Sequence, residues 1–465
     1  MCHRLFFVEE DEDYRELYQN NRRCCLEKEM KLLVVSQYFW PENFRINDIC
    51  DGLVERGHSV DVLTSLPNVP QGRFYDGYGW FKRGPKEHKG IGIERVGVIR
   101  RGSGGGLRWM LNCASFAVNS LFHLPKLRKN DYDAVFVFAN SPVTKILPAK
   151  RFAKVKKIPN VIFILDIWPE SMFFLLGMKE KGKETFFKKT SRAVSRWLYR
   201  SGDLLLVSSK GFEGKLRDMG LDNEIAYFPN YAEPFKLEKN DDISRKKLGL
   251  LKEDFVVGFA GNVGRAQGLD KLIEAAAENR NGGIKYLIVG DGSELDDIKL
   301  RCAGSRLTDR FVFTGWVDSA VVPNYLDLCD VLLVSLEDSG VLNLTVPAKL
   351  QTYMHAAKPV IAFLNGAGAE VVRKARCGAT AAAGDAEALR EAIDGIAACP
   401  KAVLEQAGRN GQVYCGEHYD REKVLDSLVD YIEDAIKDYV PIKQKRNKMP
   451  RSNQQLPEAE HTKEE

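Results

Sequence analysis

The stretch FVVGFAGNVGRAQGLDKLIEAA (residues 255–276) runs from an apolar segment of strand length, through small residues, into a helical pattern. A buried strand, a tight turn and a helix in this order form one unit of a parallel α/β sheet. The small residues from Gly261 to Gly264 let backbone N–H groups approach a phosphate, and Arg265 adds a cation there. The alternative is an ordinary strand-to-helix turn with an exposed arginine.

The same alternation of apolar runs and helical patterns continues on both sides of this stretch. Runs of strand length occur at 31–36, 59–65, 94–100, 133–139, 160–166 and 203–209, and again at 255–261, 285–292, 310–316, 330–336 and 358–363. A charged, weakly apolar segment near 234–250 separates the two groups. The pattern predicts an α/β protein of two Rossmann-like, doubly wound domains that face each other across a cleft.

This reading divides the chain into four segments. Residues 1–30 lack sustained periodicity before the strand that begins at Lys31, so they are expected to be a flexible extension and Met30 a candidate start. The expected segments are the extension (1–30), a first domain (31–235), a second domain (236–440) with a final helix at about 417–437, and a disordered tail (441–465).

Composition narrows the class of protein. The 465 residues are 44% hydrophobic and 28% charged, as in an ordinary globular protein. No stretch reaches about 18 uninterrupted apolar residues, and the first 30 residues are too charged for a signal peptide, which predicts a cytoplasmic location. The ten cysteines form no C-x-x-C pair and are expected to be reduced and mostly buried.

Charge is unevenly distributed although the net charge is only +4. Residues 31–235 contain 32 Lys and Arg side chains against 20 Asp and Glu side chains. The basic half suggests an anionic partner, either nucleic acid or an acidic membrane surface. Solvated surface charge is the alternative.

The second half of the chain resembles the donor domain of glycosyltransferase family 4. The resemblance rests on five segments in a fixed order, at 258–276, 286–299, 311–317, 325–336 and 344–362. It implies the GT-B fold and a nucleotide-sugar as donor co-substrate, bound by the second domain.

The resemblance also implies which residues hold the donor. Arg265 and Lys349 are expected to balance the diphosphate charge, although Lys349 has the alternative of a helix residue whose charged end reaches solvent. The other expected donor-binding residues are Gly261, Asn262, Gly264, Gln267, Gly290, Asp291, Val317, Thr345 and Thr352.

Two positions depart from the pattern of the family. Gln267 stands where the family usually has a lysine before the second glycine. Leu344 and Thr352 stand where the family has a pair of glutamates, so the usual hydrogen bonds between carboxylates and the nucleotide ribose are in doubt. The Thr352 hydroxyl or the Gln351 amide is a weaker substitute.

The first half resembles the acceptor domain of enzymes that add an amino sugar, such as N-acetyl-fucosamine, during bacterial O-antigen or capsule assembly. The resemblance rests on segments 36–49, 63–78, 165–171 and 227–233. It places Phe44-Arg45 where most of the family has a Gly-Gly pair, and Arg45 is either a cation facing the donor phosphates or a surface residue at a helix start. The expected acceptor or cleft residues are Asn43, Phe44, Arg45, Asn47, Trp168, Glu170 and Asn230.

Asp166 ends a buried strand, where α/β proteins bind their ligands. It is expected to orient or deprotonate the acceptor hydroxyl, and the alternative is an N-cap for the helix that follows. A histidine often precedes this aspartate in the family, but Leu165 occupies the position, which excludes a His–Asp base.

The resemblance implies a retaining transfer of a sugar, with UDP-linked amino sugars as the expected donors and a lipid-linked saccharide as acceptor. The Asp-x-Asp spacing of Asp11 and Asp13 lies in the N-terminal extension, and no metal and no other cofactor is expected. Mixed cationic and aromatic residues in the first half favour an anionic membrane over nucleic acid. The protein is therefore expected to be peripheral at the inner face of the plasma membrane.

Three other functions stay open on the sequence. A nucleotide-sugar 2-epimerase shares the two-domain architecture but needs several acid and base groups, and only His355 of the seven histidines lies in a donor motif. A catalytically inactive sugar-nucleotide-binding partner of a polysaccharide assembly complex fits the missing glutamates and histidine. A nicotinamide oxidoreductase fits less well, because no G-x-G-x-x-G follows the first strand.

Overall fold

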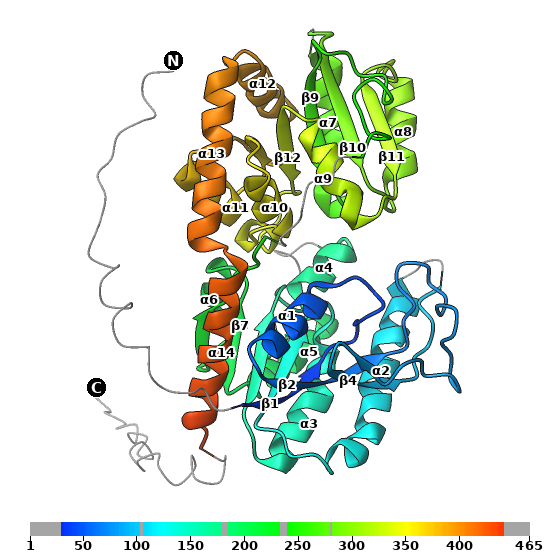
Figure 1. Ribbon diagram of the computed structural model, residues 1–465, viewed down its shortest axis with the longest axis vertical. Helices are drawn as coiled ribbons and strands as arrows, with labels where there is room; N and C mark the ends of the chain where they lie inside the picture. The colour runs from blue at the N-terminus through cyan, green and yellow to red at the C-terminus, as the bar shows by residue number, and fades with distance from the viewer. Residues whose placement is uncertain (1–28, 103–105, 179–184, 233–239, 280, 441–465) are drawn as a thin grey trace, which may run out of the picture.

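A computed structural model describes residues 29–102, 106–178, 185–232, 240–279 and 281–440. These residues form two lobes, each with a parallel sheet at its centre and helices on both faces (Figure 1). The architecture confirms the prediction of two doubly wound α/β domains. The expected N-terminal extension and C-terminal tail lie almost wholly outside the described residues.

The first lobe contains an eight-stranded sheet in the order β3-β4-β2-β1-β5-β6-β7-β8, in which β3 alone runs antiparallel to its neighbour. The strands are β1 (Lys31–Val35), β2 (Ser59–Ser65), β3 (Glu87–His88), β4 (Ile91–Val96), β5 (Ala134–Ala139), β6 (Asn160–Ile164), β7 (Leu204–Val207) and β8 (Glu224–Tyr227). The helices are α1 (Arg45–Glu55), α2 (Gly106–Leu127), η1 (Val143–Lys145), α3 (Ile146–Lys156), α4 (Glu170–Leu175), α5 (Phe186–Tyr199) and α6 (Gly211–Asp218).

The second lobe contains a six-stranded, wholly parallel sheet in the order β11-β10-β9-β12-β13-β14. The strands are β9 (Phe255–Ala260), β10 (Ile284–Val289), β11 (Phe311–Gly315), β12 (Val331–Ser335), β13 (Val360–Phe363) and β14 (Gly378–Ala381). The helices are η2 (Arg265–Gln267), α7 (Asp270–Glu278), α8 (Leu295–Gly304), η3 (Ser319–Val321), α9 (Val322–Asp327), η4 (Leu342–Leu344), α10 (Ala348–His355), α11 (Ala367–Ala375), α12 (Ala386–Ala397) and α13 (Lys401–His418).

The central strands are apolar throughout because helices cover both of their faces. On β1, Leu33 and Val35 pack into the core on one face of the sheet, whereas Leu32 and Val34 pack into the core on the other. Successive side chains of a strand point to opposite faces, so a strand buried on both sides needs a continuous apolar run. This explains why the central strands of both lobes could be recognised from the sequence.

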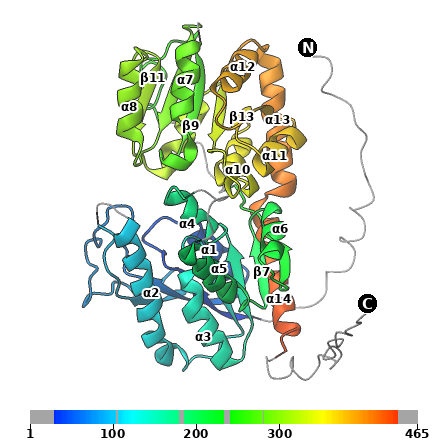
Figure 2. The same ribbon diagram turned by 180° about the vertical axis from the view of Figure 1, so that it is seen from behind.

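The last helix, α14 (Arg421–Lys437), packs on the first lobe, although its chain has just left the second (Figure 2). Its side chains Leu425 and Leu428 are fully buried in the same core as β1. Arg421 adds an ion pair with Asp48 of α1, at 3.0 Å. The sequence left open which domain this final helix rests on, and by its packing the helix belongs to the first lobe.

No helix among the described segments is long and apolar enough to cross a bilayer.

Candidate functional site

The two sheets each have a point where the chain order reverses, between β1 and β5 in the first lobe and between β9 and β12 in the second. Ligands of doubly wound proteins bind beyond the carboxyl ends of the strands at such points. Asn140 and Ser141 follow β5, and Gly261 follows β9. Gly261, a predicted donor residue, therefore lies at such a point.

The turn after β9 brings two strand ends unusually close together. Gly261 has φ +133° and Gly290, after β10, has φ +132°, a region that residues with a Cβ rarely adopt. A Cβ on Gly290 would also lie 2.0 Å from the carbonyl oxygen of Gly261. Both predicted glycines are thus required by the backbone at the place where a phosphate would approach.

Lys349, the second residue of α10, reaches this turn. Its Nζ donates a hydrogen bond to Gln267 Oε1 at 2.8 Å and lies 3.8 Å from the centroid of the Phe259 ring. Burial lowers the pKa of Lys349 to about 7. The structure therefore brings three predicted donor residues together, Gly261, Gln267 and Lys349, since a Cβ on Gly261 would lie 2.6 Å from the Lys349 Cε.

Arg265 begins η2 and is exposed at the same turn. A Cβ placed on Gly177, which follows α4 of the first lobe, would be 3.7 Å from its Nη1, so Arg265 reaches across to the other lobe. Glu337, after β12, donates its backbone N–H to the Ala266 carbonyl at 2.9 Å. Burial raises the pKa of the Glu337 carboxyl, and the positive charge of Arg265 opposes that rise.

The other predicted donor residues have mainly backbone or local contacts. Asp291 accepts from the Gly292 N–H at 2.7 Å, and its own carbonyl accepts from the Val263 N–H at 2.9 Å. Thr345 and Thr352 both donate to carbonyls four residues earlier, at 3.3 and 3.5 Å. Three further residues occupy varied places: Asn262 is exposed, Gly264 precedes η2, and Val317 packs at the edge of the apolar core of the second lobe.

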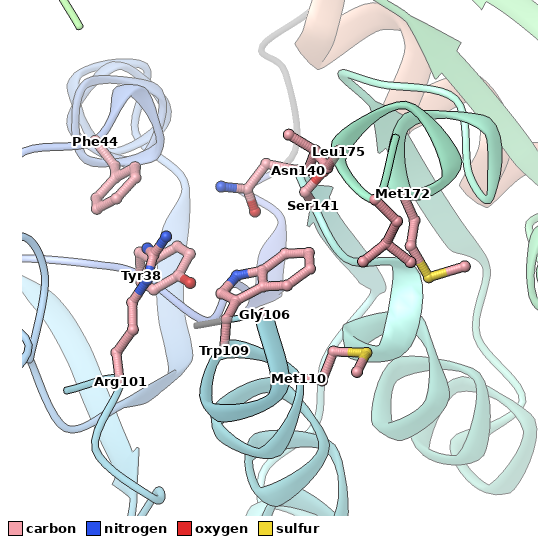
Figure 3. A pocket seen from close by; sticks show the side chains of 11 residues that line it. Tyr38, Phe44, Arg101, Gly106, Trp109, Met110, Asn140, Ser141, Met172 and Leu175 are labelled. Carbon is pink, nitrogen blue, oxygen red and sulfur yellow. The ribbon is translucent and has the colours of Figure 1, made fainter. Parts of the chain in front are cut away.

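A cavity of about 540 Å³ opens in the first lobe beside the end of β5 (Figure 3). Aromatic and apolar side chains dominate its wall, with Arg101 and the Asn140 amide as polar groups. Its lining is Tyr38, Phe44, Arg101, Gly106, Trp109, Met110, Asn140, Ser141, Met172, Leu175 and Leu176. Of the predicted cleft residues, Phe44 lines this cavity directly.

Asp166 lies behind the cavity and is held by two of its neighbours. The Ser141 hydroxyl donates to Asp166 Oδ2, and the indole Nε1 of Trp168 donates to the same oxygen at 2.8 Å. Burial raises the pKa of the Asp166 carboxyl, and these hydrogen bonds oppose that rise. The N-cap of α4 is Pro169, so the alternative role of Asp166 as the cap of this helix is wrong.

A buried lysine that was not predicted stands next to this group. Lys145 is fully buried and donates to the Asn140 Oδ1 atom. Burial lowers its pKa to about 8, and its charge is one of the influences that favour the ionised form of Asp166. Because a lysine only donates, the Asn140 Oδ1 faces Lys145 and the amide Nδ2 is left to serve the cavity.

Two predicted cleft residues, Arg45 and Asn47, have structural contacts within the first lobe. Arg45 donates to the Tyr231 carbonyl at 2.7 Å and lies over the Tyr231 ring, so its role toward the donor phosphates stays a prediction. Asn47 accepts from the Trp40 N–H at 3.0 Å and donates to the Glu42 carbonyl at 2.8 Å, which holds the loop before α1.

Of the remaining cleft residues, Asn43 contacts the second lobe, whereas Glu170 and Asn230 are buried in the first. Asn43 donates to the Ser319 hydroxyl of the second lobe at 3.0 Å, a direct hydrogen bond across the cleft. Glu170 is buried and pairs with Arg192 at 3.2 Å. Asn230 is buried just before Tyr231.

Among the residues that the structure describes, no group of three His, Cys, Asp or Glu side chains is arranged to hold a metal ion. The absence of a metal requirement stays a prediction. The Asp11 and Asp13 spacing lies outside the described residues.

Two protein-family models match the chain. Residues 43–231 match the glycosyl transferase 4-like domain, and residues 254–398 match the glycosyl transferases group 1. The two matched ranges correspond to the first and second lobes.

Known proteins agree with these matches. A glycosyl transferase of Escherichia coli provisionally assigned to colanic acid biosynthesis, WcaI, is 27% identical over 331 residues, which cover 69% of this chain and 80% of that protein. Sucrose-phosphate synthase from Thermosynechococcus elongatus superposes with a TM-score of 0.68 at 17% identity, covering 88% of this chain and 99% of that one. HepE from Anabaena, solved with UDP and glucose, superposes with a TM-score of 0.64 at 18% identity, covering 87% and 100%.

Proposed function

Since the chain belongs to the glycosyltransferases that combine a 4-like domain with a group 1 domain, we propose that it is a retaining, metal-independent transferase. It moves a sugar, in our proposal an acetamido sugar, from a UDP-sugar to a lipid-linked saccharide during synthesis of a cell-surface polysaccharide. The assignment to polysaccharide synthesis is supported by the likeness to the Escherichia coli enzyme. The choice of UDP is supported by the fold neighbour that was solved with UDP and glucose.

The observation that carries the proposal is the placement of cations in one lobe opposite a buried carboxyl in the other. Lys349 and Arg265 stand at the strand-end turn of the second lobe. Asp166 stands behind the cavity of the first lobe, and Arg265 reaches toward Gly177 of that lobe. A donor diphosphate at the turn and an acceptor hydroxyl in the cavity would meet between them.

In the proposed reaction the bond from the sugar C1 to the diphosphate breaks, and a bond from C1 to the acceptor oxygen forms on the same face. The acceptor proton passes to an oxygen of the leaving diphosphate, so UDP departs with it. Arg265, Lys349 and the N–H groups near Gly261 stabilise the negative charge that builds on the diphosphate. Asp166 orients the acceptor hydroxyl.

The acceptor cavity has the mixed character that a saccharide on an apolar carrier needs. Trp109 lies 5.9 Å from Trp168, centroid to centroid, and rings of this kind stack on sugar faces, while Asn140 and Ser141 offer hydrogen bonds. Met110, Leu175 and Leu176 are exposed apolar side chains at the cavity wall. The protein then works as a peripheral protein at the inner face of the plasma membrane, where such acceptors are exposed.

A thermal-shift screen over UDP-, dTDP-, GDP- and ADP-sugars tests the donor class. A ligand at 100 times its dissociation constant stabilises the folded state by about 2.7 kcal/mol. We expect UDP-sugars to raise the Tm of the wild-type protein and to do so less in Lys349→Met. The proposal is contradicted if no nucleotide sugar raises the Tm.

A further inference from the structure

A second cavity of the first lobe is lined by three arginines. Arg73, Arg100 and Arg108 surround a space of about 530 Å³, together with Trp80. The other lining residues are Gln71, Gly72, Val98, Ile99 and Gly102. No carboxylate occurs among the described residues that line this cavity, so its positive charge suits an anion.

These three arginines have no ion-pair partner among the described residues. No described carboxylate lies within 4.0 Å of any of them, whereas Arg56 and Arg421 of the same lobe each pair with two or more carboxylates. The guanidinium of Arg100 lies 5.9 Å from the centre of the Phe74 ring. Three exposed guanidinium groups on one cavity are therefore available to phosphate oxygens.

Helix α2 starts beside this cavity and exposes an apolar face. Successive residues of a helix turn by about 100°, so Leu111, Val118 and Phe122 share one stripe. These side chains are 43%, 50% and 77% exposed, although the lobe already has a complete core. No acidic residue occurs anywhere in the 22 residues of the helix.

Aromatic side chains flank the arginine cavity on its other side. Phe81 is fully exposed and Trp80 is 49% exposed. A Cβ on Gly97 would lie 2.4 Å from the Trp80 ring, and the Gly97 carbonyl accepts from Asn119 of α2 at 2.7 Å. The loop with Trp80 and Phe81 thus lies next to α2, so the arginines, the aromatic side chains and the apolar stripe lie on adjoining elements, which together form the candidate surface.

We propose that this surface docks the protein on an anionic phospholipid bilayer, with lipid phosphates in the arginine cavity and the α2 stripe on the acyl region. Arginine with tryptophan and phenylalanine beside an apolar helix face is the combination that binds at a bilayer interface. The inference rests on the proposed function and adds how the protein is oriented on the membrane. Arg108 lines the arginine cavity, and Trp109, the next residue of α2, lines the acceptor cavity. Docking through the arginine cavity therefore sets the acceptor cavity against the membrane.

Another exposed aromatic group, on α5, is a weaker candidate for this role. Trp197 is 51% exposed, but the Lys150 ammonium lies 3.2 Å from the centre of its ring and Lys188 is buried. The α3–α5 side of the lobe therefore provides a matched control. Arg151, Lys154 and Lys157 are exposed there, and their replacement removes the same three charges.

The test measures binding of the full chain to vesicles by co-sedimentation. The vesicles are phosphatidylcholine with 30% phosphatidylglycerol, compared with pure phosphatidylcholine. We expect the wild-type protein to bind the anionic vesicles and the triple variant Arg73→Gln, Arg100→Gln, Arg108→Gln to bind about 100-fold more weakly, at about fivefold for each arginine. The control variant Arg151→Gln, Lys154→Gln, Lys157→Gln should bind the anionic vesicles within about threefold of the wild type, because salt screens charges that lie far from the docked surface.

A second pair of variants tests the apolar stripe. Val118→Asp with Phe122→Asp should abolish binding, while Val403→Asp with Val413→Asp on α13, which are 45% and 61% exposed, should leave it unchanged. The thermal shift with UDP reports on folding and on the donor site in every variant. Equal vesicle binding by the triple arginine variant, the stripe variant Val118→Asp with Phe122→Asp, and the controls overturns the docking surface. The absence of a thermal shift with UDP in the wild-type protein overturns the proposed function instead.

Binding of farnesyl diphosphate tests whether the arginine cavity holds the diphosphate of a lipid-linked substrate and not the phosphates of a phospholipid bilayer. If it binds the wild-type protein but not the triple arginine variant, while anionic vesicles are bound equally by both, the cavity holds the diphosphate of a substrate. That result contradicts docking on phospholipid.

Discussion

Lys349 Nζ lies 2.8 Å from Gln267 Oε1, so the glutamine that replaces the family's usual lysine holds the ammonium of a different lysine at the donor turn. Lys349 of α10 thus provides a cation at the turn, where position 267 has a neutral glutamine. Burial lowers the pKa of Lys349 to about 7, because the ammonium is removed from water.

The affinity for UDP should therefore depend on pH through Lys349. A bound diphosphate favours the charged lysine, and the free protein loses that charge as the pH rises above about 7. We expect UDP to bind roughly tenfold more weakly at pH 8.5 than at pH 7, because binding takes up one proton. Titration calorimetry of the wild type and Lys349→Met measures this. In Lys349→Met the UDP affinity should change with pH only through the titration of UDP itself, so its pH dependence should be weaker than in the wild type. The same pH dependence of UDP affinity in the two proteins contradicts the role of Lys349.

Arg265 should act on the transition state more than on binding. A charge-assisted hydrogen bond that tightens as the diphosphate leaves lowers the barrier selectively. Arg265→Ala should lose about 10²–10³ in kcat, the usual effect of removing one such donor, while Tm and UDP affinity change little. Arg265→Lys should restore part of the rate, since it returns the charge without the two-pronged geometry. A kcat of Arg265→Ala within about threefold of the wild type contradicts this role.

Asp166→Asn separates the charge of this carboxyl from its shape. The amide oxygen can still accept from Ser141 and Trp168, so the fold and the cavity should persist. We expect kcat to fall by about 10²-fold, the lower range for loss of one group that positions or stabilises the reacting atoms, with the UDP dissociation constant unchanged. A fall in Tm equal to that of Asp166→Ala would instead indicate a structural role.

Glu42 provides a test of stability that is independent of catalysis. Its Oε1 accepts from the Asn68 and Val69 N–H groups at 2.7 Å, its Oε2 has no partner among the described residues, and burial raises its pKa to about 7. The folded protein therefore holds a proton that the unfolded chain releases above about pH 4.5, so this contribution to stability is lost as the pH rises through 7.

Glu42→Gln keeps the accepting oxygen and cannot ionise. We expect it to match the wild type within about 0.5 kcal/mol at pH 5 and to exceed it by about 2 kcal/mol at pH 8, in line with the raised pKa. Urea unfolding at the two pH values measures the difference. A difference that does not change with pH contradicts the account.

Metal removal tests the charge stabilisation directly. If Arg265, Lys349 and backbone N–H groups carry the charge of the leaving diphosphate, turnover should persist in excess EDTA. Loss of turnover that magnesium or manganese restores contradicts the metal-free proposal.

Much of the fold was accessible from the sequence because the central strands are buried on both faces. Continuous runs such as 133–139 and 330–336 correspond to β5 and β12. The short edge strands β8 and β14 were not recognised, since they are four residues long and only partly buried. The amphipathic pattern of α14 predicted a helix but not which sheet it covers, because either lobe could bury the same stripe.

The candidate site was accessible where the chemistry is local. The glycines at 261 and 290 stand out because a strand end with these positions needs an unusual backbone. Lys145 and Glu42 were not recognised, because their burial depends on neighbours distant in the sequence. The hydroxyl of Thr352 was expected to face the nucleotide, yet it donates within its own helix, a local competitor that spacing alone does not reveal.

The most direct test of the central claim follows a donor labelled with ¹³C at C1 by NMR in the presence of diphosphate-linked saccharide lipids. Each member of a panel of UDP-hexoses and UDP-acetamido sugars is tested with the wild type and with Arg265→Ala. We predict that one donor releases UDP in step with a new glycosidic C1 signal of unchanged anomeric configuration, and that Arg265→Ala slows both by about 10²–10³-fold. Formation of a C2 epimer without UDP release, or binding of donors with no turnover for any of them, would contradict the assignment as a glycosyltransferase.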